Sequence, residues 1–186
     1  MAYTESNMMP LGTTAPPFAL PDTVSDKTLT INDISANAAA TVVLFLCNHC
    51  PFVKHINAEL VAVARDYQPR GVAFVAISSN DAAAYPQDAP DLMKIVAHTE
   101  GYTFPYLYDA TQAVARAYDA ACTPDLYVFD ENLKLVYRGR FDASRPKNDL
   151  PTNGADLRDA LDAILQGEIP QPQLPSAGCN IKWKVV

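Results

Sequence analysis

The chain has 186 residues, a formal net charge of -7 at pH 7, 49% hydrophobic residues and 19% charged residues. These proportions are typical of a globular protein with a sizeable core, and they predict one domain over residues 1–186. The negative charge and the lack of any Lys/Arg cluster exclude a nucleic-acid partner. No apolar run approaches the ~18 residues of a membrane span, and residues 1–7 lack an export signal, so we expect a cytoplasmic protein.

The first half of the chain predicts strands that alternate with helices. Residues 1–40 form an N-terminal β extension, with short strands expected at 18–20 and 28–31. The core, 41–167, begins with an apolar strand over 42–46 and a helix over 52–67 whose apolar residues follow helical spacing. A nearly continuous apolar strand over 72–77 is typical of a parallel sheet.

The second half continues this order and ends in a tail. The pattern predicts helices over 91–99, where the apolar residues are Leu92, Ile95 and Val96, and over 110–118, with an extended piece between them. A hairpin with strands at 126–129 and 133–138 and a helix over 156–166 follow; residues 168–186 form a Pro-rich, extended tail. We therefore expect an α/β fold with a mixed central sheet flanked by helices.

Two cysteines stand where the strand over 42–46 runs into the next helix. Cys47-Asn48-His49-Cys50 places two thiols two residues apart at the first turn of that helix. A helix N-terminus stabilises a thiolate, and such cysteines reach pKa values of roughly 3.5–7.5 instead of about 8.5. Because the thiolate is the nucleophile in disulfide exchange, the motif indicates a redox function.

With this motif the chain resembles the thioredoxin superfamily, in particular its peroxiredoxin-like, AhpC/TSA-type redoxins. The resemblance rests on Cys47-Asn48-His49-Cys50, on Thr123-Pro124 before the strand over 125–129, and on the insert over 104–118. It implies a thioredoxin fold with an N-terminal β extension, a peroxiredoxin-like insert and a C-terminal tail. It also implies that Thr123-Pro124 is the cis-proline loop beside the redox cysteines.

The peroxiredoxin pattern fits the chain only in part. The peroxidatic cysteine of the motif Pro-x-x-x-Thr/Ser-x-x-Cys falls on Cys50, but the hydroxyl position falls on Cys47 and the proline position on Val43. The arginine that activates peroxide falls near Pro124. Without these helpers the transition state for peroxide reduction is poorly stabilised, so we expect weak peroxidase activity at most.

The thioredoxin pattern fits better. It gives Cys47 the attacking role and Cys50 the resolving role, with Thr123 and Pro124 aligning an extended substrate segment. One departure is that the position of the buried acid, which assists the second cysteine, holds Thr41.

His49 lies between the two cysteines. An imidazole there can stabilise the Cys47 thiolate and make the disulfide more oxidising, with a potential above the roughly -270 mV of thioredoxin and towards about -180 mV. The alternative is a solvated surface histidine without influence on the thiols.

The other two cysteines are candidates for an auxiliary redox role. Cys122 directly precedes Thr123-Pro124, and Cys179 lies in the tail beside the only tryptophan, Trp183, which suggests that the tail docks onto the body. Either the two form a second pair, or the tail cysteine relays oxidation from the active site. The alternative is that both are inert thiols in the core.

Two further classes of function remain as alternatives. A zinc or copper(I) site could use Cys47, His49 and Cys50 with Cys122 or His55 as the fourth ligand. An electron-transfer or adaptor module could present the tyrosine-rich segment 102–108, although aromatic residues at strand spacing are more often core. We predict neither a cofactor nor a metal.

These observations together favour a thiol–disulfide oxidoreductase that exchanges disulfides through Cys47 and Cys50. Its partners would be protein or small-molecule disulfides and dithiols and a cellular reductant, and the protein would be a monomer or a dimer. The alternative is a weak thiol peroxidase, in which Cys50 becomes a sulfenic acid and Cys47 condenses with it.

Overall fold

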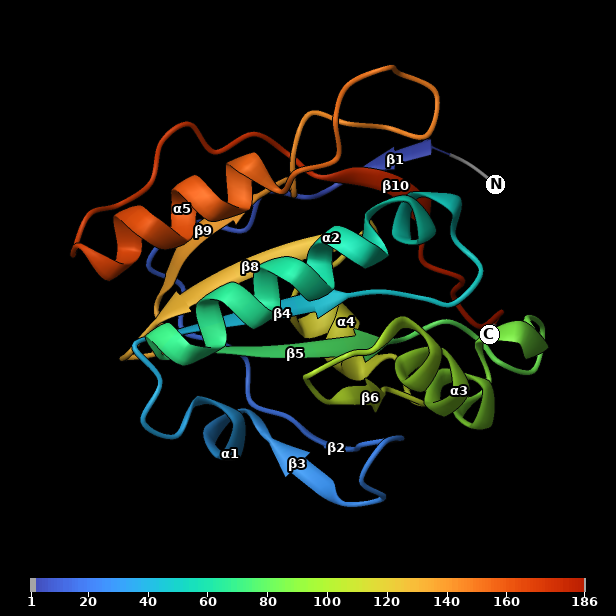
Figure 1. Ribbon diagram of the computed structural model, residues 1–186. Helices are drawn as coiled ribbons and strands as arrows, with labels where there is room; N and C mark the ends of the chain where they lie inside the picture. The colour runs from blue at the N-terminus through green and yellow to red at the C-terminus, as the bar shows by residue number, and fades with distance from the viewer. Residues whose placement is uncertain (1–2, 186) are drawn as a thin grey trace.

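A five-stranded sheet forms the centre of the computed structural model, which describes residues 3–185 (Figure 1). Its strand order is β6-β5-β4-β8-β9; β4, β5 and β6 are parallel, whereas β8 and β9 make an antiparallel hairpin beside β4. The fold class predicted from the sequence, α/β with a mixed sheet, is confirmed. The strands are β4 (Ala40–Phe45), β5 (Val72–Ser78), β6 (Tyr106–Tyr108), β8 (Asp125–Asp130) and β9 (Leu135–Gly139).

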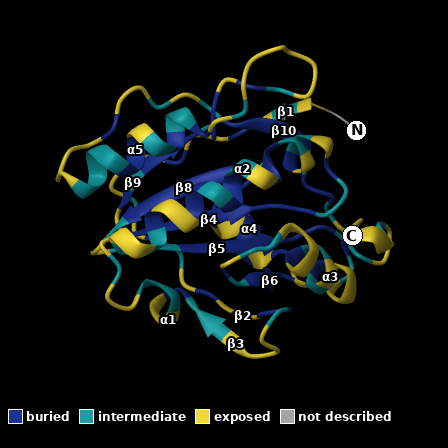
Figure 2. Ribbon diagram, viewed as in Figure 1, coloured by how far each residue is buried: buried dark blue, intermediate teal, exposed yellow. Residues whose placement is uncertain are grey.

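Alternate residues of β4 enter two different cores, because successive side chains of a strand point to opposite faces. Val42 and Leu44 pack with α2, α3 and α5, while Val43 and Phe45 pack with α4 and the N-terminal segment. Figure 1 shows α2 in front of the sheet, and Figure 2 shows that the central strands are mostly buried. The helices are α2 (Pro51–Tyr67), α3 (Pro90–Glu100), α4 (Ala113–Ala117) and α5 (Ala155–Leu165).

The N-terminal extension contains a hairpin and a short helix. β2 (Ala19–Pro21) and β3 (Thr28–Thr30) pair antiparallel, and α1 (Ile31–Ser35) follows at once. The sequence had suggested a strand up to residue 31. Thr30 instead caps α1: its hydroxyl accepts from the backbone N–H of Asp33, whose carboxylate accepts from the Thr30 N–H.

The C-terminal tail supplies a strand, where the sequence analysis predicted docking but no particular element. β10 (Ala177–Asn180) lies between β1 (Tyr3–Glu5) and β7 (Cys122–Thr123) in an antiparallel three-stranded sheet. The expected docking of the tail is confirmed, because the Arg116 guanidinium lies 4.6 Å from the centre of the Trp183 ring. The tail therefore places the C-terminal strand β10 next to the N-terminal strand β1, beside the Thr123-Pro124 loop.

Two helices differ from their sequence-based prediction. The helix expected over 110–118 is shortened to α4, and α3 buries Met93 and Ala97 rather than Leu92 and Ile95, which are exposed. Two short 3₁₀ turns, η1 (Gln68–Arg70) and η2 (Pro86–Asp88), lie in the connections. Within residues 3–185, none of the helices combines the length and the apolar character that crossing a membrane requires.

Candidate functional site

The two cysteines of the motif lie at the carboxyl end of β4, where the chain enters α2. Cys50 is the N-cap residue of α2, and Pro51 occupies the first helical position, where its missing N–H costs nothing. Cys47 and Cys50 have exposed fractions of only 1% and 0%. A partner therefore has to approach through the half-buried residues between them, Asn48 and His49.

Hydrogen-bond donors converge on the Cys50 sulfur. The Cys47 thiol is the most important, and the Cys179 thiol and the backbone N–H of Val53 add to it. Although burial acts in the opposite direction, these donors lower the pKa of Cys50 to about 5. The position at the start of a helix favours the same charge state. Cys50 is thus the thiol that ionises at neutral pH.

Cys47 has the opposite surroundings. Its sulfur lies 3.5 Å from Thr123 Oγ1. The pKa of Cys47 is raised because its thiol donates to Cys50, because it is buried, and because the Asp88 carboxylate is close. From the sequence we expected the helix N-terminus and His49 to give the low pKa to Cys47. The structure differs because the donors face Cys50.

The loop opposite the two thiols is Thr123-Pro124, and its peptide bond is cis, as the resemblance implied. The Thr123 carbonyl oxygen lies 3.2 Å from Cys50 Sγ, and its hydroxyl contacts Cys47. The structure thus brings all five predicted site residues, from both segments of the chain, into one cluster.

A buried ion pair lies directly behind this loop, and the sequence did not reveal it. The guanidinium of Arg138 binds the carboxylate of Asp125 through two nitrogens, and it also donates to the carbonyl of Leu126 at 3.0 Å. Both charged side chains have no exposed surface. Because Asp125 follows Pro124 immediately, the pair fixes the start of β8 and thereby the loop.

His49 binds a carboxylate that the sequence analysis missed. Its Nδ1 lies 2.6 Å from Asp88 Oδ2, and its ring stacks on Tyr85 at 5.7 Å. The fully buried Asp88 also accepts from the backbone N–H of Asn48 and the side chain of Asn80, both at 2.8 Å. His49 is therefore a largely buried histidine held by a carboxylate, with a ring nitrogen within 4.8 Å of the Cys47 sulfur.

The two auxiliary cysteines lie on different sides of the β7–β10 pair. Cys179 is directly opposite Thr123, and Cys122 is opposite Asn180. Opposed residues share a face of an antiparallel pair, whereas neighbours along a strand do not. Cys179 thus shares the face of Thr123 and contacts Cys50, while Cys122 points to the other face and lies 3.6 Å from the Pro124 carbonyl oxygen. This register does not favour a disulfide between Cys122 and Cys179.

The possible metal ligands differ from those considered from the sequence. Cys47, His49 and Asp88 place one ligand atom each within 4.8 Å of one another. Of the two expected fourth ligands, His55 is engaged elsewhere, with its Nε2 near Ser144 and Thr152. Nδ1 of His49 and Oδ2 of Asp88 already bind each other at 2.6 Å. This geometry gives the metal alternative no additional support.

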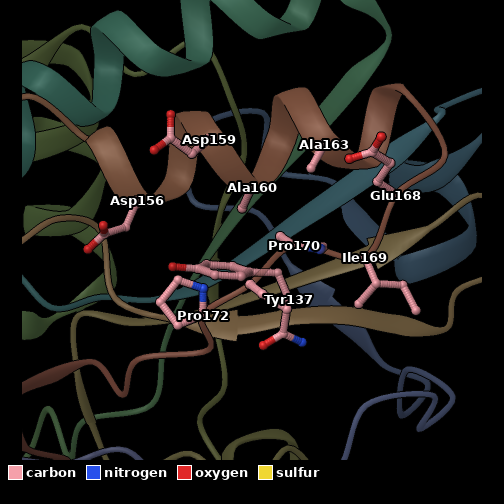
Figure 3. Close-up of a pocket in the computed structure, with 10 residues that line it drawn as sticks. Tyr137, Asp156, Asp159, Ala160, Ala163, Glu168, Ile169, Pro170 and Pro172 are labelled. Carbon is pink, nitrogen blue, oxygen red and sulfur yellow. The ribbon is translucent and has the colours of Figure 1, made fainter.

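A well-formed pocket of about 320 Å³ lies elsewhere, between α5 and the segment after it (Figure 3). Its lining includes Tyr137 and the carboxylates of Asp156, Asp159 and Glu168, but none of the cysteines. A second pocket, of about 540 Å³, borders the motif and is lined in part by Asn48, His49 and the exposed apolar side chains of α3. Of these two pockets, only the second borders the thiol site.

Comparison with known proteins agrees with the fold. An uncharacterized conserved protein from Geobacillus kaustophilus is 58% identical, with a TM-score of 0.96, over 99% of this chain and 97% of that one. A hypothetical protein from Sinorhizobium meliloti 1021 is 46% identical, with a TM-score of 0.95, over 98% of this chain and 100% of that one. The thioredoxin domain of a thiol-disulfide oxidoreductase from Bacteroides vulgatus has a TM-score of 0.57 at 15% identity, over 68% of this chain and 86% of that one.

The structural likeness confirms the thioredoxin fold expected from the sequence. No curated protein matches the chain. The model of the AhpC/TSA family matches residues 11–138, which is more than two thirds of the sequence. The chain therefore belongs to the AhpC/TSA family of redox proteins with a thioredoxin fold.

Proposed function

We propose that the protein is a thiol–disulfide oxidoreductase that exchanges disulfides through Cys47 and Cys50. The observation that carries this proposal is the thiol pair at the start of α2, whose two sulfurs both contact Thr123 of the opposite loop; hydrogen bonds that lower the pKa of Cys50 support it. A thiolate beside a second thiol supplies both a nucleophile and the group that resolves a mixed disulfide.

The first step needs a nucleophile on Cys47, which lies next to the two half-buried residues of the motif. The Cys47 thiolate is supplied by a minor form of the pair, in which the shared proton has moved along the hydrogen bond from Cys47 to Cys50; the raised pKa of Cys47 keeps this form scarce but makes its thiolate strongly nucleophilic. The new Cys50 thiol then donates to the Thr123 carbonyl at 3.2 Å. Cys47 attacks one sulfur of the partner disulfide, forms a mixed disulfide and releases the other sulfur as a thiolate.

The second step uses Cys50. Its thiol loses its proton to the departing thiolate, and Cys50 attacks the Cys47 sulfur. The bond between Cys47 and the partner breaks, the protein holds a Cys47–Cys50 disulfide, and the partner leaves with one thiol and one thiolate, which takes a proton from water. The two electrons come from the two cysteines, and the same steps in reverse oxidise a dithiol.

The apolar surface beside the motif supports a protein as the partner. Leu92, Ile95 and Val96 of α3 line the pocket that borders His49. Ile95 has an exposed fraction of 58%, which is unusual for an isoleucine and suits contact with an extended segment. Thr123 would align this segment from the other side.

The proposal includes a cellular reductant and a cytoplasmic location, where thiols are kept reduced.

Rapid mixing of the reduced protein with a protein disulfide tests this function. The wild type, Cys47→Ser and Cys50→Ser are compared, and Cys122→Ser serves as a matched control. We expect fast exchange in the wild type and the control, and no fast exchange in Cys47→Ser. A Cys47→Ser variant that exchanges at the wild-type rate would contradict the proposal.

A thiol peroxidase is the second candidate, and one observation favours it. Cys50 occupies the peroxidatic position and has a pKa of about 5, as a peroxide-reactive thiolate requires. The helper positions are nevertheless occupied by Cys47 and Pro124, which offer no guanidinium. Mixing with hydrogen peroxide decides: a fast reaction that needs Cys50 identifies a peroxidase, whereas reaction at the rate of ordinary thiols supports the exchange reaction.

A further inference from the structure

A third thiol reaches the same site from the tail. Cys179 of β10 lies opposite Thr123, shares its face of the strand pair and is a hydrogen-bond partner of Cys50. It belongs to the core cluster that contains Cys47 and Cys50. Cys50 thus has two thiols as hydrogen-bond partners, Cys47 from the motif and Cys179 from the tail.

The tail is held firmly at this position. The Ser176 hydroxyl donates to the Pro124 carbonyl at 2.7 Å. A Cβ on Gly178 would lie 2.0 Å from the Thr123 carbonyl oxygen, so only glycine permits this approach of β10 to the loop. The contact between Cys179 and Cys50 therefore follows from specific packing of the tail, beyond the mere presence of a cysteine near the C-terminus.

We propose that Cys179 is a second redox partner of Cys50, so that the oxidised protein exchanges a Cys47–Cys50 disulfide for a Cys50–Cys179 disulfide. This inference rests on the proposed function, because it starts from the Cys47–Cys50 disulfide. Cys179 attacks the Cys50 sulfur, the bond from Cys50 to Cys179 forms, and the bond from Cys47 to Cys50 breaks. The proton of Cys179 ends on Cys47, and no external oxidant is needed.

The oxidised state also makes Cys179 easier to ionise. In the reduced protein, burial, the hydrogen bond to Cys50 and the charge of Cys50 raise the pKa of Cys179 to about 12. In the disulfide Cys50 carries no charge, so the last two effects disappear. The Lys182 ammonium, which lowers the pKa of Cys179, remains. The exchange restores a thiol at Cys47, and the protein then holds its disulfide between Cys50 at the start of α2 and Cys179 in the tail.

Tryptic peptides distinguish the two disulfides directly. Cys47 and Cys50 both lie in peptide 28–54, Cys122 lies in 117–134, and Cys179 lies in 159–182. A Cys47–Cys50 bond therefore stays within one peptide, whereas a Cys50–Cys179 bond links two. The reduced protein is oxidised with diamide, which accepts the two hydrogens, and its remaining thiols are alkylated in acid before digestion and mass spectrometry.

The wild type and three variants complete the test. We expect the pair 28–54/159–182 in the wild type, in Cys122→Ser, and as the main product in Cys47→Ser, whose fold is checked by circular dichroism. Absence of this pair from both the wild type and a folded Cys47→Ser would overturn the proposal. Cys179→Ser separates the two hypotheses: without the tail thiol, diamide should still form the Cys47–Cys50 bond within peptide 28–54. If it does so while the peptide pair is missing elsewhere, the tail role fails and the proposed function stands.

Discussion

Cys47 and Cys50 are separated by two residues, yet they lie in opposite electrostatic surroundings. Donors from α2, β10 and Cys47 itself face Cys50, and lower its pKa to about 5. Cys47 lies at the end of a strand, near the buried carboxylate of Asp88, and its pKa is raised. The hydrogen bonds and charges around the pair therefore favour the negative charge on the second cysteine.

The comparison shows that the spacing of a motif does not determine which of its thiols ionises. A helix N-terminus favours a thiolate in general, but the choice between two sulfurs depends on residues far away in the sequence. Here these are Asp88 in η2 and Cys179 in β10. Substitutions at the thiol pair and at the residues around it give four predictions.

The largest effect is expected from Cys50→Ser. The variant lacks the group that accepts the proton of Cys47 and the group that resolves the mixed disulfide, so repeated turnover falls to the rate of ordinary thiols. A mixed disulfide between Cys47 and the partner should accumulate and be visible by mass spectrometry. Unchanged turnover would show that Cys50 has neither role; the control, Cys122→Ser, should keep turnover.

Arg138→Met tests the ion pair behind the loop. It leaves the carboxylate of Asp125 buried without its partner, and breaking a buried pair in this way costs about 3–5 kcal/mol of unfolding free energy. Urea denaturation measures the loss. Arg70→Met removes an exposed pair with Asp162 and should change stability far less. Similar losses in the two variants would mean that the buried pair contributes no more to the unfolding free energy than the exposed pair.

Asp88→Asn tests the contrast between the two thiols, because it should narrow the difference between their pKa values. Removal of the negative charge favours ionisation of Cys47, so its pKa falls and its alkylation at neutral pH accelerates, by up to about tenfold if the gain reaches ~1.4 kcal/mol. The rate of iodoacetamide labelling of Cys47 measures this. Asp91→Asn, on the exposed side of α3, should leave the rate unchanged. Slower labelling in Asp88→Asn would show that Asp88 activates Cys47 through His49 instead.

The smallest effect is expected from Cys122→Ser. Burial and the charge of Asp125 raise the pKa of Cys122, and its side chain lies on the face away from the other thiols. Exchange rates should stay close to those of the wild type, measured with the same protein disulfide. A marked loss of exchange would place Cys122 in the reaction.

The sequence was sufficient for the parts of the site that follow local rules. The strand that ends before Cys47, the helix that starts after Cys50 and the cis loop at Thr123-Pro124 all have local patterns, and the structure agrees with each. The alternation of β4 between two cores likewise follows from an apolar run flanked by helices.

Other parts of the site depend on tertiary contacts that leave no local pattern. Asp88 lies in a Pro-punctuated turn and resembles any other turn carboxylate; the nearby Asn80, at the carboxyl end of β5, was its only signal. β10, Ala177–Asn180, contains small residues and no β-branched one, so propensity did not predict a strand. The low pKa of Cys50 depends partly on this strand, and for that reason the charge was first assigned to Cys47.

The most direct test of the account is a pH titration of thiolate absorbance in the reduced protein. We expect one thiolate to appear in the wild type with a midpoint near pH 5, because the folded pKa of Cys50 lies well below the free value of about 8.5. This thiolate is present at neutral pH, disappears as the pH falls through 5, and is missing in Cys50→Ser. A wild-type titration without any thiolate below pH 7, or an unchanged low-pH step in Cys50→Ser, would contradict the assignment of the charge to Cys50.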